Sequence, residues 1–244
     1  MKKLLVLLVA VCSISALAEN QVLYTLDFED YPAGSVFGYD GWEKFYGTQV
    51  DAVVDSTVAH TGEVCLFTDG ANSFKNDIDI SGDYQEGMEL LIKFFVKIPS
   101  SSNERKFYVK LHNRGTISKK YDNEIAEFQV GKTGFTVNTG SGYKSGNGDF
   151  VDVWTECGIQ IDPANRTIKR LYVGENDFDL KEDPWTYKTN TEGSNNLIDG
   201  VRLMGDWGVG CQGYFDDFSV EAVPEPAFLG LLALAGLFFA RKQR

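Results

Sequence analysis

The sequence predicts an all-β protein whose body, residues 19–222, folds as an antiparallel β-sandwich. Short runs rich in β-branched and aromatic residues follow one another from Gln21 to Val223, and clusters of Gly, Asn, Asp and Ser separate them. No window shows the apolar stripe of an amphipathic helix. Evenly spaced strands with Gly-rich turns are typical of a two-sheet sandwich or jelly roll, so we expect this class of fold.

The apolar and alternating runs place the individual strands. In residues 153–162, Cys157, Ile159 and Ile161 share one predicted face and Glu156 and Gln160 the other. Residues 167–174 show no clean polar face, and the Gly- and Ser-rich residues 139–149 are expected to form a flexible surface loop. The expected strands are 22–29, 63–68, 88–98, 106–112, 124–130, 134–139, 153–162, 167–174, 197–205 and 213–223.

The charge balance excludes one class of partner. The chain has 244 residues and a formal net charge of -12 at pH 7. A surface of this sign repels phosphate backbones, so nucleic acid is not an expected partner.

The first 18 residues are typical of a secretory signal peptide. Lys2 and Lys3 precede an apolar run, and Ala16 and Ala18 form a small-x-small cleavage site before Glu19. Acylation of Cys12 is the alternative, but Val11 stands where that pathway requires a small residue. The sequence therefore predicts export of the body.

The last residues, 223–244, form a second apolar segment. Residues 227–240 are all apolar or small, and as a helix they span about 21 Å, against about 30 Å for a hydrocarbon core. Arg241, Lys242 and Arg244 follow at once and are expected to stay in the cytoplasm. We expect a short transmembrane helix over 227–240 that anchors the protein temporarily in the inner membrane.

Pro224, Glu225 and Pro226, the apolar run and the basic tip together resemble the PEP-CTERM sorting signal of bacterial surface proteins. In that family the Pro-Glu-Pro motif is read by exosortase, a membrane transpeptidase, and the signal is removed on the way to the cell surface or the exopolysaccharide matrix. The resemblance implies that Pro224, Glu225 and Pro226 are recognition residues, and that exosortase and the secretion machinery are partners. Two prolines also give an extended segment that a protease can grip.

A second resemblance concerns the body. Trp154 opens a run ending in Ile159-x-Ile161-Asp162, a turn follows, and the segment T-I-K-R-L-Y-V-G (167–174) closes the hairpin. This pattern, with LDFED near the start and GYFDDFSVEAV near the end, is similar to concanavalin A-like and laminin-G-like jelly rolls. The resemblance implies a fold and does not imply an activity.

The candidate catalytic residues make no convincing constellation, so we expect no enzymatic activity. Glu124 and Glu127 come nearest to a glucanase pair, but a spacing of three places them on opposite faces of a regular strand. A polysaccharide lyase would need a Tyr or His base beside a cation, and His112 shares its face with Lys110. A secreted glycosidase or lyase on the same fold remains the alternative.

Asp216 is the strongest candidate for a metal ligand. It alternates with Phe218 and Val220, which places a carboxylate near the core, where it must be hydrogen-bonded or metal-bound. Asp27 and Glu29 lie on the first strand, which is often a neighbour of the last in such sandwiches. Carboxylates suit calcium, and the resemblance to calcium-stabilised jelly rolls also favours a structural Ca²⁺ at Asp27, Glu29 and Asp216. The alternative is a hydrogen-bonded Asp.

Aromatic residues in turn-rich segments are the candidate sugar contacts. Flat rings there could stack on a polysaccharide, whereas Trp154 is expected in the core. The alternative is that these rings fold back over the sandwich as part of its core. The candidates are Trp42, Trp185, Tyr187 and Trp207.

Removal of the leader leaves Cys65, Cys157 and Cys211. An odd number allows at most one internal bridge, and export permits a disulfide without requiring one. Cys157 and Cys211 both lie in late strand-like segments, which favours that pair. The alternative is three small buried side chains.

These features together predict an exported bacterial cell-surface or extracellular-matrix protein. Its jelly-roll domain is expected to bind polysaccharide or to be structural, without catalysis. After transient anchoring in the inner membrane, the protein is expected at the cell surface or in the matrix.

Overall fold

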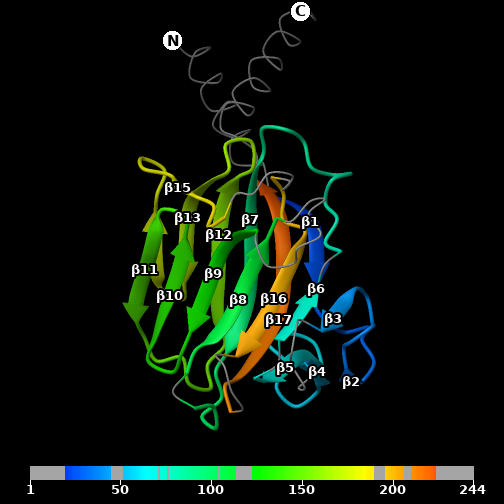
Figure 1. Ribbon diagram of the computed structural model, residues 1–244. Helices are drawn as coiled ribbons and strands as arrows, with labels where there is room; N and C mark the ends of the chain where they lie inside the picture. Colours follow the sequence, from blue (N-terminus) through cyan, green and yellow to red (C-terminus); the bar gives the residue numbers. More distant parts are fainter. Residues whose placement is uncertain are drawn as a thin grey trace, which may run out of the picture.

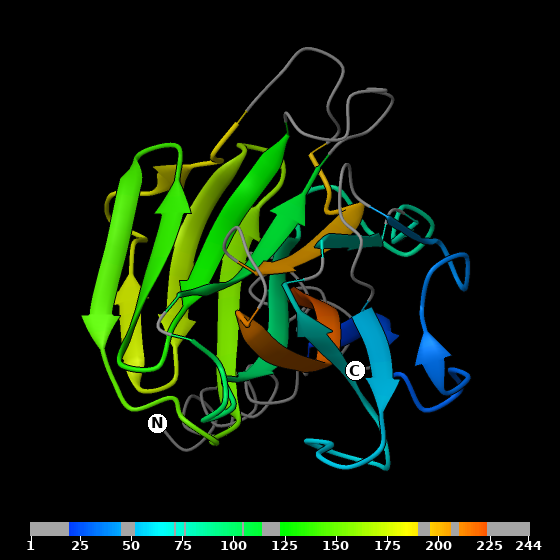
Figure 2. The same ribbon diagram turned by 60° about the horizontal axis from the view of Figure 1, so that its bottom comes forward.

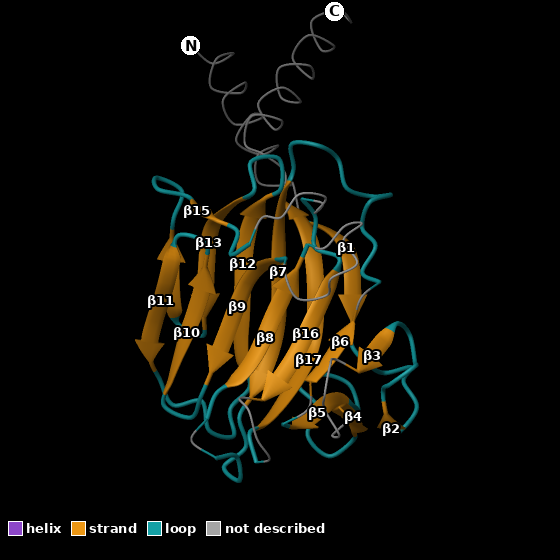
Figure 3. Ribbon diagram, in the orientation of Figure 1, coloured by secondary structure: helices purple, strands orange, loops and turns teal. Residues whose placement is uncertain are grey.

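The structure is a computed structural model that describes residues 20–44, 52–70, 72–75, 77–103, 105–113, 123–189, 196–205 and 210–223. Within these ranges every regular element is a strand, and the strands form two sheets packed face to face (Figures 1 and 3). All pairings between the named strands are antiparallel. The predicted antiparallel β-sandwich is confirmed.

One sheet has ten strands and centres on two long neighbours, β7 (Glu89–Lys97) and β17 (Gln212–Val223). β1 (Gln21–Leu26) also pairs with β17, and β15 (Trp185–Thr186) pairs with β13. The main order is β14 (Asn176–Asp179), β13 (Thr167–Val173), β12 (Thr155–Asp162), β7, β17, β5 (Cys65–Asp69), β4 (Ala52–Asp55) and β2 (Gly34–Ser35).

The second sheet has seven strands and lies in front in Figure 1. Figure 2 shows β2 and β3 at the side of the sandwich away from β10 and β11. The order is β11 (Gly142–Asn147), β10 (Gly134–Thr139), β9 (Glu124–Val130), β8 (Phe107–His112), β16 (Gly200–Gly205), β6 (Asn72–Lys75) and β3 (Trp42–Lys44).

The core lies between the sheets and follows from alternation along the strands. β7 buries every second residue, among them Ile92 and Phe94, and β8 does the same with Phe107 and Val109 from the opposite sheet. The rings of Phe94 and Phe128 meet edge to face across the core, with centroids 5.1 Å apart. The alternate residues of each strand therefore point outward and form the two outer faces.

Most expected strands are present, and two of them have the predicted bounds, 124–130 and 134–139. The prediction of a flexible surface loop over residues 139–149 is wrong. These residues contain β11, which pairs with β10 from Gly134↔Asn147 to Thr139↔Gly142. β11 has few apolar side chains, because it is an exposed edge strand at the end of its sheet. Hydrophobic alternation therefore did not reveal it.

A bulge explains the unclear pattern of residues 167–174. The register between β12 and β13 shifts between Gln160 and Ile161, so that Ile161 pairs with Ile168 and Gln160 pairs with Arg170. The extra residue, Lys169, shifts the alternation. Ile168 and Leu171 can therefore both be buried although three positions separate them.

The first and last strands are neighbours, as predicted: Gln21 pairs with Ala222 and Leu26 with Phe218. The expected signal peptide with its cleavage residues, and the expected sorting signal with helix 227–240, lie outside the described residues. None of the described segments forms a helix able to cross a membrane.

Candidate functional site

The outer face of the seven-stranded sheet carries a band of polar side chains, here called the polar track. On β8, Phe107, Val109 and Leu111 fill the core, so Tyr108 and Lys110 face outward. Glu127 and Asn138 lie beside Lys110 in the neighbouring strands, because Lys110 pairs with Glu127 and Glu127 with Asn138. The polar track comprises Lys106, Tyr108, Lys110, Glu124, Glu127, Gln129, Thr136, Asn138, Lys188 and Arg202.

A bulge in β9 brings Glu124 and Glu127 to the same face, which corrects the expectation that they lie on opposite faces. Leu111 pairs with Ala126 and His112 pairs with Glu124, so Ile125 has no partner in β8. Ile125 and Ala126 are both buried, and the strand alternation therefore shifts by one residue between the two glutamates. Their spacing of three thus becomes a same-face pair.

Two lysines hold these glutamates in a four-membered charge cluster. Lys110 Nζ lies 3.0 Å from Glu124 Oε1 and 2.5 Å from Glu127 Oε2. Lys188 Nζ lies 2.7 Å from Glu124 Oε2 and 2.8 Å from Glu127 Oε2. Glu127 Oε1 also accepts hydrogen bonds from Gln129 at 2.5 Å and Asn138 at 2.9 Å. These contacts fix the orientation of all four side chains relative to one another.

The cluster keeps both carboxyl groups ionised. Burial raises the pKa of Glu127, but hydrogen bonds from Lys110 and Lys188 outweigh it and lower that pKa to about 2. The pKa of Glu124 is also lowered, because the charges of Lys110 and Lys188 overcome the effect of burial. A general acid in glycoside hydrolysis needs a raised pKa. Neither glutamate is suited to that role near neutral pH.

A short segment after β15 brings Lys188 to this face. The backbone N–H of Lys188 donates to the carbonyl of Ile125 at 2.9 Å, and that of Thr189 donates to the carbonyl of Glu124 at 2.9 Å. The bulge of β9 thus provides the carbonyls that fix the segment. Sequence analysis missed Lys188 because it lies in a turn-like stretch remote from the strands that it joins.

His112 is placed for structure and not for contact with a substrate. Its side chain is completely buried, and its ring meets Phe74 edge to face at 5.0 Å between centroids. Burial lowers the pKa of His112 to about 3, so the ring is neutral at pH 7. Lys110 does share its face, as predicted for a lyase, but His112 is not accessible as a base.

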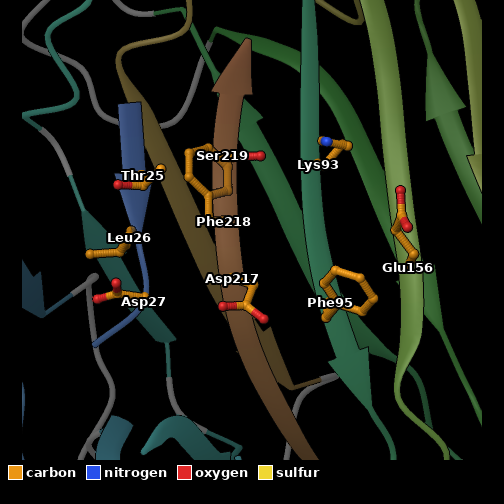
Figure 4. Close-up of a pocket in the computed structure, with 9 residues that line it drawn as sticks. All are labelled: Thr25, Leu26, Asp27, Lys93, Phe95, Glu156, Asp217, Phe218 and Ser219. Atoms are coloured by element: carbon orange, nitrogen blue, oxygen red, sulfur yellow. The ribbon is translucent and has the colours of Figure 1, made fainter. Parts of the chain in front are cut away.

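The outer face of the ten-stranded sheet holds a shallow depression of about 380 Å³ (Figure 4). Glu156, Phe95 and Asp217 line it from the neighbouring strands β12, β7 and β17. Each charged group already has a partner: Tyr172 donates to Glu156 at 2.5 Å, and His60 Nδ1 lies 2.6 Å from Asp217 Oδ2. Both carboxylates therefore already have hydrogen-bond partners within the protein.

Asp216 is completely buried, as predicted, in a bulge of β17 next to this depression. Its two oxygens accept the backbone N–H groups of His60 and Asp217, both at 2.9 Å. Burial raises the pKa of Asp216 to about 6, although these hydrogen bonds oppose the rise. Asp217 follows with φ 47°, a left-handed conformation that turns its side chain to the outer face.

The three predicted calcium ligands lie in different surroundings, and calcium binding by them stays a prediction. Asp27 and Glu29 are exposed, and Glu29 Oε1 accepts the backbone N–H groups of Glu63 at 2.9 Å and Val64 at 3.2 Å. Across the described ranges, no three His, Cys, Asp or Glu side chains are placed to hold a metal ion. At both Glu29 and Asp216, backbone N–H groups donate to the carboxylate.

The prediction that aromatic rings in turn-rich segments contact sugars is wrong for Trp42 and Tyr187. Trp42 is 1% exposed and donates to the Tyr31 hydroxyl at 3.3 Å, and Tyr187 is 2% exposed and donates to the carbonyl of Asn196 at 3.1 Å. Both are core residues, because large rings contribute most when they are buried. Trp185 is half-buried beneath Lys144, whose Nζ lies 4.8 Å from the ring centroid. Trp207 lies outside the described residues.

Trp154 does not belong to the buried core, contrary to expectation. It is half-buried on the outer side of the ten-stranded sheet, where its ring lies 5.6 Å from that of His60 and 6.3 Å from that of Tyr214. Trp154 precedes β12, so the alternation of that strand does not direct its ring inward.

The predicted disulfide between Cys157 and Cys211 is not formed. Cys157 lies in the middle of the ten-stranded sheet, paired with Phe94 and Val173, and its thiol is free. The Cys211 thiol instead donates to the carbonyl of Lys106, at 2.9 Å. Cys65, Cys157 and Cys211 are all buried, which agrees with the alternative of small core side chains.

Comparisons with known proteins show the fold. The sequence matches no protein-family model and no curated protein. An endo-β-1,4-glucuronan lyase from the fungus Trichoderma reesei superposes with a TM-score of 0.50 at 12% identity, covering 83% of this chain and 96% of that chain. At this identity the likeness establishes a shared β-sandwich and no activity.

Two further solved structures are similar at lower TM-scores. A xylan-binding domain from Paenibacillus barcinonensis has a TM-score of 0.43 at 14% identity and covers 84% of this chain and 97% of that chain. The binding domain of botulinum neurotoxin serotype D has a TM-score of 0.49 at 12% identity. The match covers 93% of this chain but only 53% of the neurotoxin domain.

Proposed function

We propose that this protein is an exported, noncatalytic polysaccharide-binding protein, and that the polar track on the seven-stranded sheet is its binding face. The observation that carries the proposal is the charge cluster of Lys110, Lys188, Glu124 and Glu127, which is fixed at the middle of an outward sheet face. Side chains that are already orientated lose little freedom on binding.

The chemistry of the track suits a hydroxyl-rich ligand. Lysine amines and the amides of Gln129 and Asn138 donate, whereas carboxylate and hydroxyl oxygens accept, so a sugar hydroxyl can meet both kinds of partner. From Lys106 to Lys110 the track extends about 13 Å along β8, which is long enough for more than one linked sugar. A polymer is therefore a better match than a small metabolite.

The ionisation of the glutamates supports binding over hydrolysis. Both carboxyl groups have lowered pKa values and both contact two lysines, so neither can supply the proton that a leaving sugar needs. The fold that this chain shares with a glucuronan lyase supports a polysaccharide as the class of ligand and supports no activity.

Export and sorting belong to the same proposal. The leader of residues 1–18 would deliver the body across the inner membrane, and Pro224, Glu225 and Pro226 would present the tail to exosortase. Intact-mass measurement on protein from its native host tests this part. Loss of residues 1–18 and of the segment after Pro226 is expected, and a full-length mass would contradict it.

The binding proposal is tested with the full chain on an array of polysaccharides, followed by affinity electrophoresis in gels that contain the best ligand. Asn138→Ala should weaken binding by about fivefold, because it removes one donor from the centre of the track. Ser219→Ala, on the opposite outer face, is the matched control and should bind as the unaltered chain does. Binding to no polysaccharide, or equal loss in both variants, would contradict the proposal.

Lyase activity is the second candidate, because Tyr108 and Lys110 face outward from β8 and Lys110 pairs with Arg202 in the neighbouring strand β16. A lyase needs a base and a cation beside the uronate. The test is the ultraviolet absorbance of unsaturated uronate ends after incubation with polyuronates. We expect none, and a signal that Tyr108→Phe abolishes would replace binding with catalysis.

A further inference from the structure

A second depression, of about 400 Å³, lies on the seven-stranded sheet at the end of the track where β8 begins. It is formed by the start of β8, the turn between β9 and β10, and the edge strand β11. Its polar side chains are Lys106, Lys132, Thr133, Thr136, Ser145 and Asn147. No acidic residue is among its lining residues, as far as the chain is described.

The amine of Lys106 is held at this depression without a carboxylate partner. Lys106 Nζ donates to Thr136 Oγ1 at 2.8 Å, and Thr136 in turn lies across from Ser145 in the sheet. Within the described ranges Lys106 takes part in no ion pair. Lys132 adds a second amine, which donates to the carbonyl of Ser100 at 3.0 Å.

Two glycines allow the chain to pack closely around this depression. A Cβ on Gly131 would stand 3.4 Å from Lys106 Cγ, and a Cβ on Gly134 would stand 2.9 Å from the carbonyl oxygen of Gly146. A side chain at Gly134 would therefore collide with β11. Glycine at this position lets β10 and β11 approach each other where they form the wall of the depression.

The charge of this depression is opposite to that of the chain. The protein as a whole has a net charge of -12, whereas the depression offers two lysines. Farther along the track, Lys110 and Lys188 neutralise Glu124 and Glu127, so the track presents no unpaired carboxylate next to the depression. An anionic group bound here would be attracted locally, and the rest of the surface would repel it.

We propose that this depression binds an anionic group of the polysaccharide, a carboxylate or a sulfate ester, so that the ligand of the polar track is an acidic polysaccharide. This inference rests on the proposed function and narrows it. Lys106 and Lys132 bind the negative charge, the hydroxyls of Thr133 and Thr136 add hydrogen bonds, and the neighbouring sugars lie along β8 and β9.

The test compares matched polymers on the full chain by isothermal titration calorimetry. The probes are polygalacturonate, the same polymer after reduction of its carboxyl groups to alcohols, and dextran sulfate beside neutral dextran. We expect an acidic polymer to bind at least tenfold more tightly than its neutral counterpart, with an affinity that falls as salt rises. The two acidic probes distinguish carboxylate from sulfate.

Variants locate the effect. Lys106→Gln and Lys132→Gln should each weaken binding of the acidic polymer by about fivefold, and should weaken binding of the neutral polymer much less, because the neutral polymer has no charge to lose a partner. Lys97→Gln removes the same charge from the outer face of the ten-stranded sheet and should change nothing. Lys106→Arg should retain binding, and an unchanged melting temperature shows that each variant is folded.

The outcomes separate the two proposals. If the neutral and acidic polymers bind equally, or if Lys97→Gln weakens binding as much as Lys106→Gln, the proposal that the depression binds an anionic group is wrong, but the proposal of polysaccharide binding is not. If no polymer binds, both proposals are wrong. If Lys106→Gln and Lys132→Gln selectively weaken the acidic polymer, both are supported.

Discussion

Two buried carboxylates of this protein have pKa values that are shifted in opposite directions, although burial raises both. Glu127 lies on the seven-stranded sheet beside Lys110 and Lys188, and its pKa falls to about 2. Asp216 lies in the bulge of β17, where its oxygens meet backbone N–H groups, and its pKa rises to about 6. Backbone dipoles satisfy hydrogen bonds but do not repay the loss of hydration of a full charge, whereas two ammonium groups do.

This difference in chemistry separates the roles that we propose for the two regions. The cluster around Glu127 is ionic and lies on an outward face, where its two lysines are partly exposed, at 13% for Lys110 and 27% for Lys188, and can donate to a ligand. In the Asp216 bulge both aspartates already have partners within the protein. The backbone N–H of His60 donates to Asp216, and the His60 ring nitrogen Nδ1 contacts Asp217. In the proposed function the first region binds the ligand, whereas the second region attaches the backbone and side chain of His60 and the side chain of Thr61 to β17.

Lys110→Met tests the ionic region with the largest expected effect. It leaves two carboxylates beside Lys188 alone, and we expect the free energy of unfolding to fall by about 3 kcal/mol. Urea unfolding measures it. Adding Glu127→Gln to this variant should recover part of the loss, since one uncompensated charge is removed. A fall below about 0.5 kcal/mol would show that the cluster is solvated and not structural.

Asp216→Asn tests the bulge of β17. We expect the free energy of unfolding to fall by about 2 kcal/mol. The asparagine oxygen can accept one backbone N–H, but its amide nitrogen then faces another donor. Thermal and urea unfolding both report the change. Asp27→Asn is the matched control on an exposed carboxylate and should leave stability unaltered. Equal stability of Asp216→Asn and the unaltered chain would contradict the hydrogen bonding described for the bulge.

The pH dependence of stability should differ in sign between the two regions. The pKa of Glu127 is lowered on folding from 4.5 to about 2, so its contribution is present above pH 4.5 and is lost as pH falls toward 2. The pKa of Asp216 is raised from 3.8 to about 6, so its contribution is present below pH 3.8 and is lost as pH rises through 6.

Urea unfolding of two variants at several pH values measures these contributions. Glu127→Gln should lose less stability than the unaltered chain between pH 4.5 and 2, because its side chain does not titrate. Asp216→Asn should lack the decline that Asp216 causes between pH 3.8 and 6. If the free energy of unfolding varied with pH in the same way for all three proteins, folding would shift the pKa of neither Glu127 nor Asp216.

Calcium should have the smallest effect. The oxygens of Glu29 and Asp216 already accept backbone N–H groups, so we expect millimolar Ca²⁺ or a chelator to leave the melting temperature unchanged. Differential scanning fluorimetry measures this. A rise with Ca²⁺ that Asp216→Asn abolishes would show that the bulge rearranges around a cation.

The fold could be predicted from the sequence because the core strands alternate regularly. The run around Ile92 and Phe94, and the run around Ile159, each place every second residue in the core. The edge strand β11 could not be found this way, since an exposed strand has no apolar face to signal it.

The candidate site was less predictable, because a β-bulge determines which side chains share its face. The extra residue Ile125 brings Glu124 and Glu127 together, and a one-residue shift exchanges the two faces of a strand. Lys188 joins them from a segment that binds the bulge carbonyls. The burial of Trp42 and Tyr187 likewise depends on packing between distant segments, so their turn-like sequence context misidentified them.

The pairing of β1 with β17 determines how this body would respond to mechanical load. Gln21 lies opposite Ala222, so both ends of the folded region emerge from the same end of one antiparallel pair. Tension applied between these ends would separate β1 from β17 one hydrogen bond at a time. β1 would therefore detach from the sheet first, whereas a tether through one end alone would place no force on the pairing of β1 with β17.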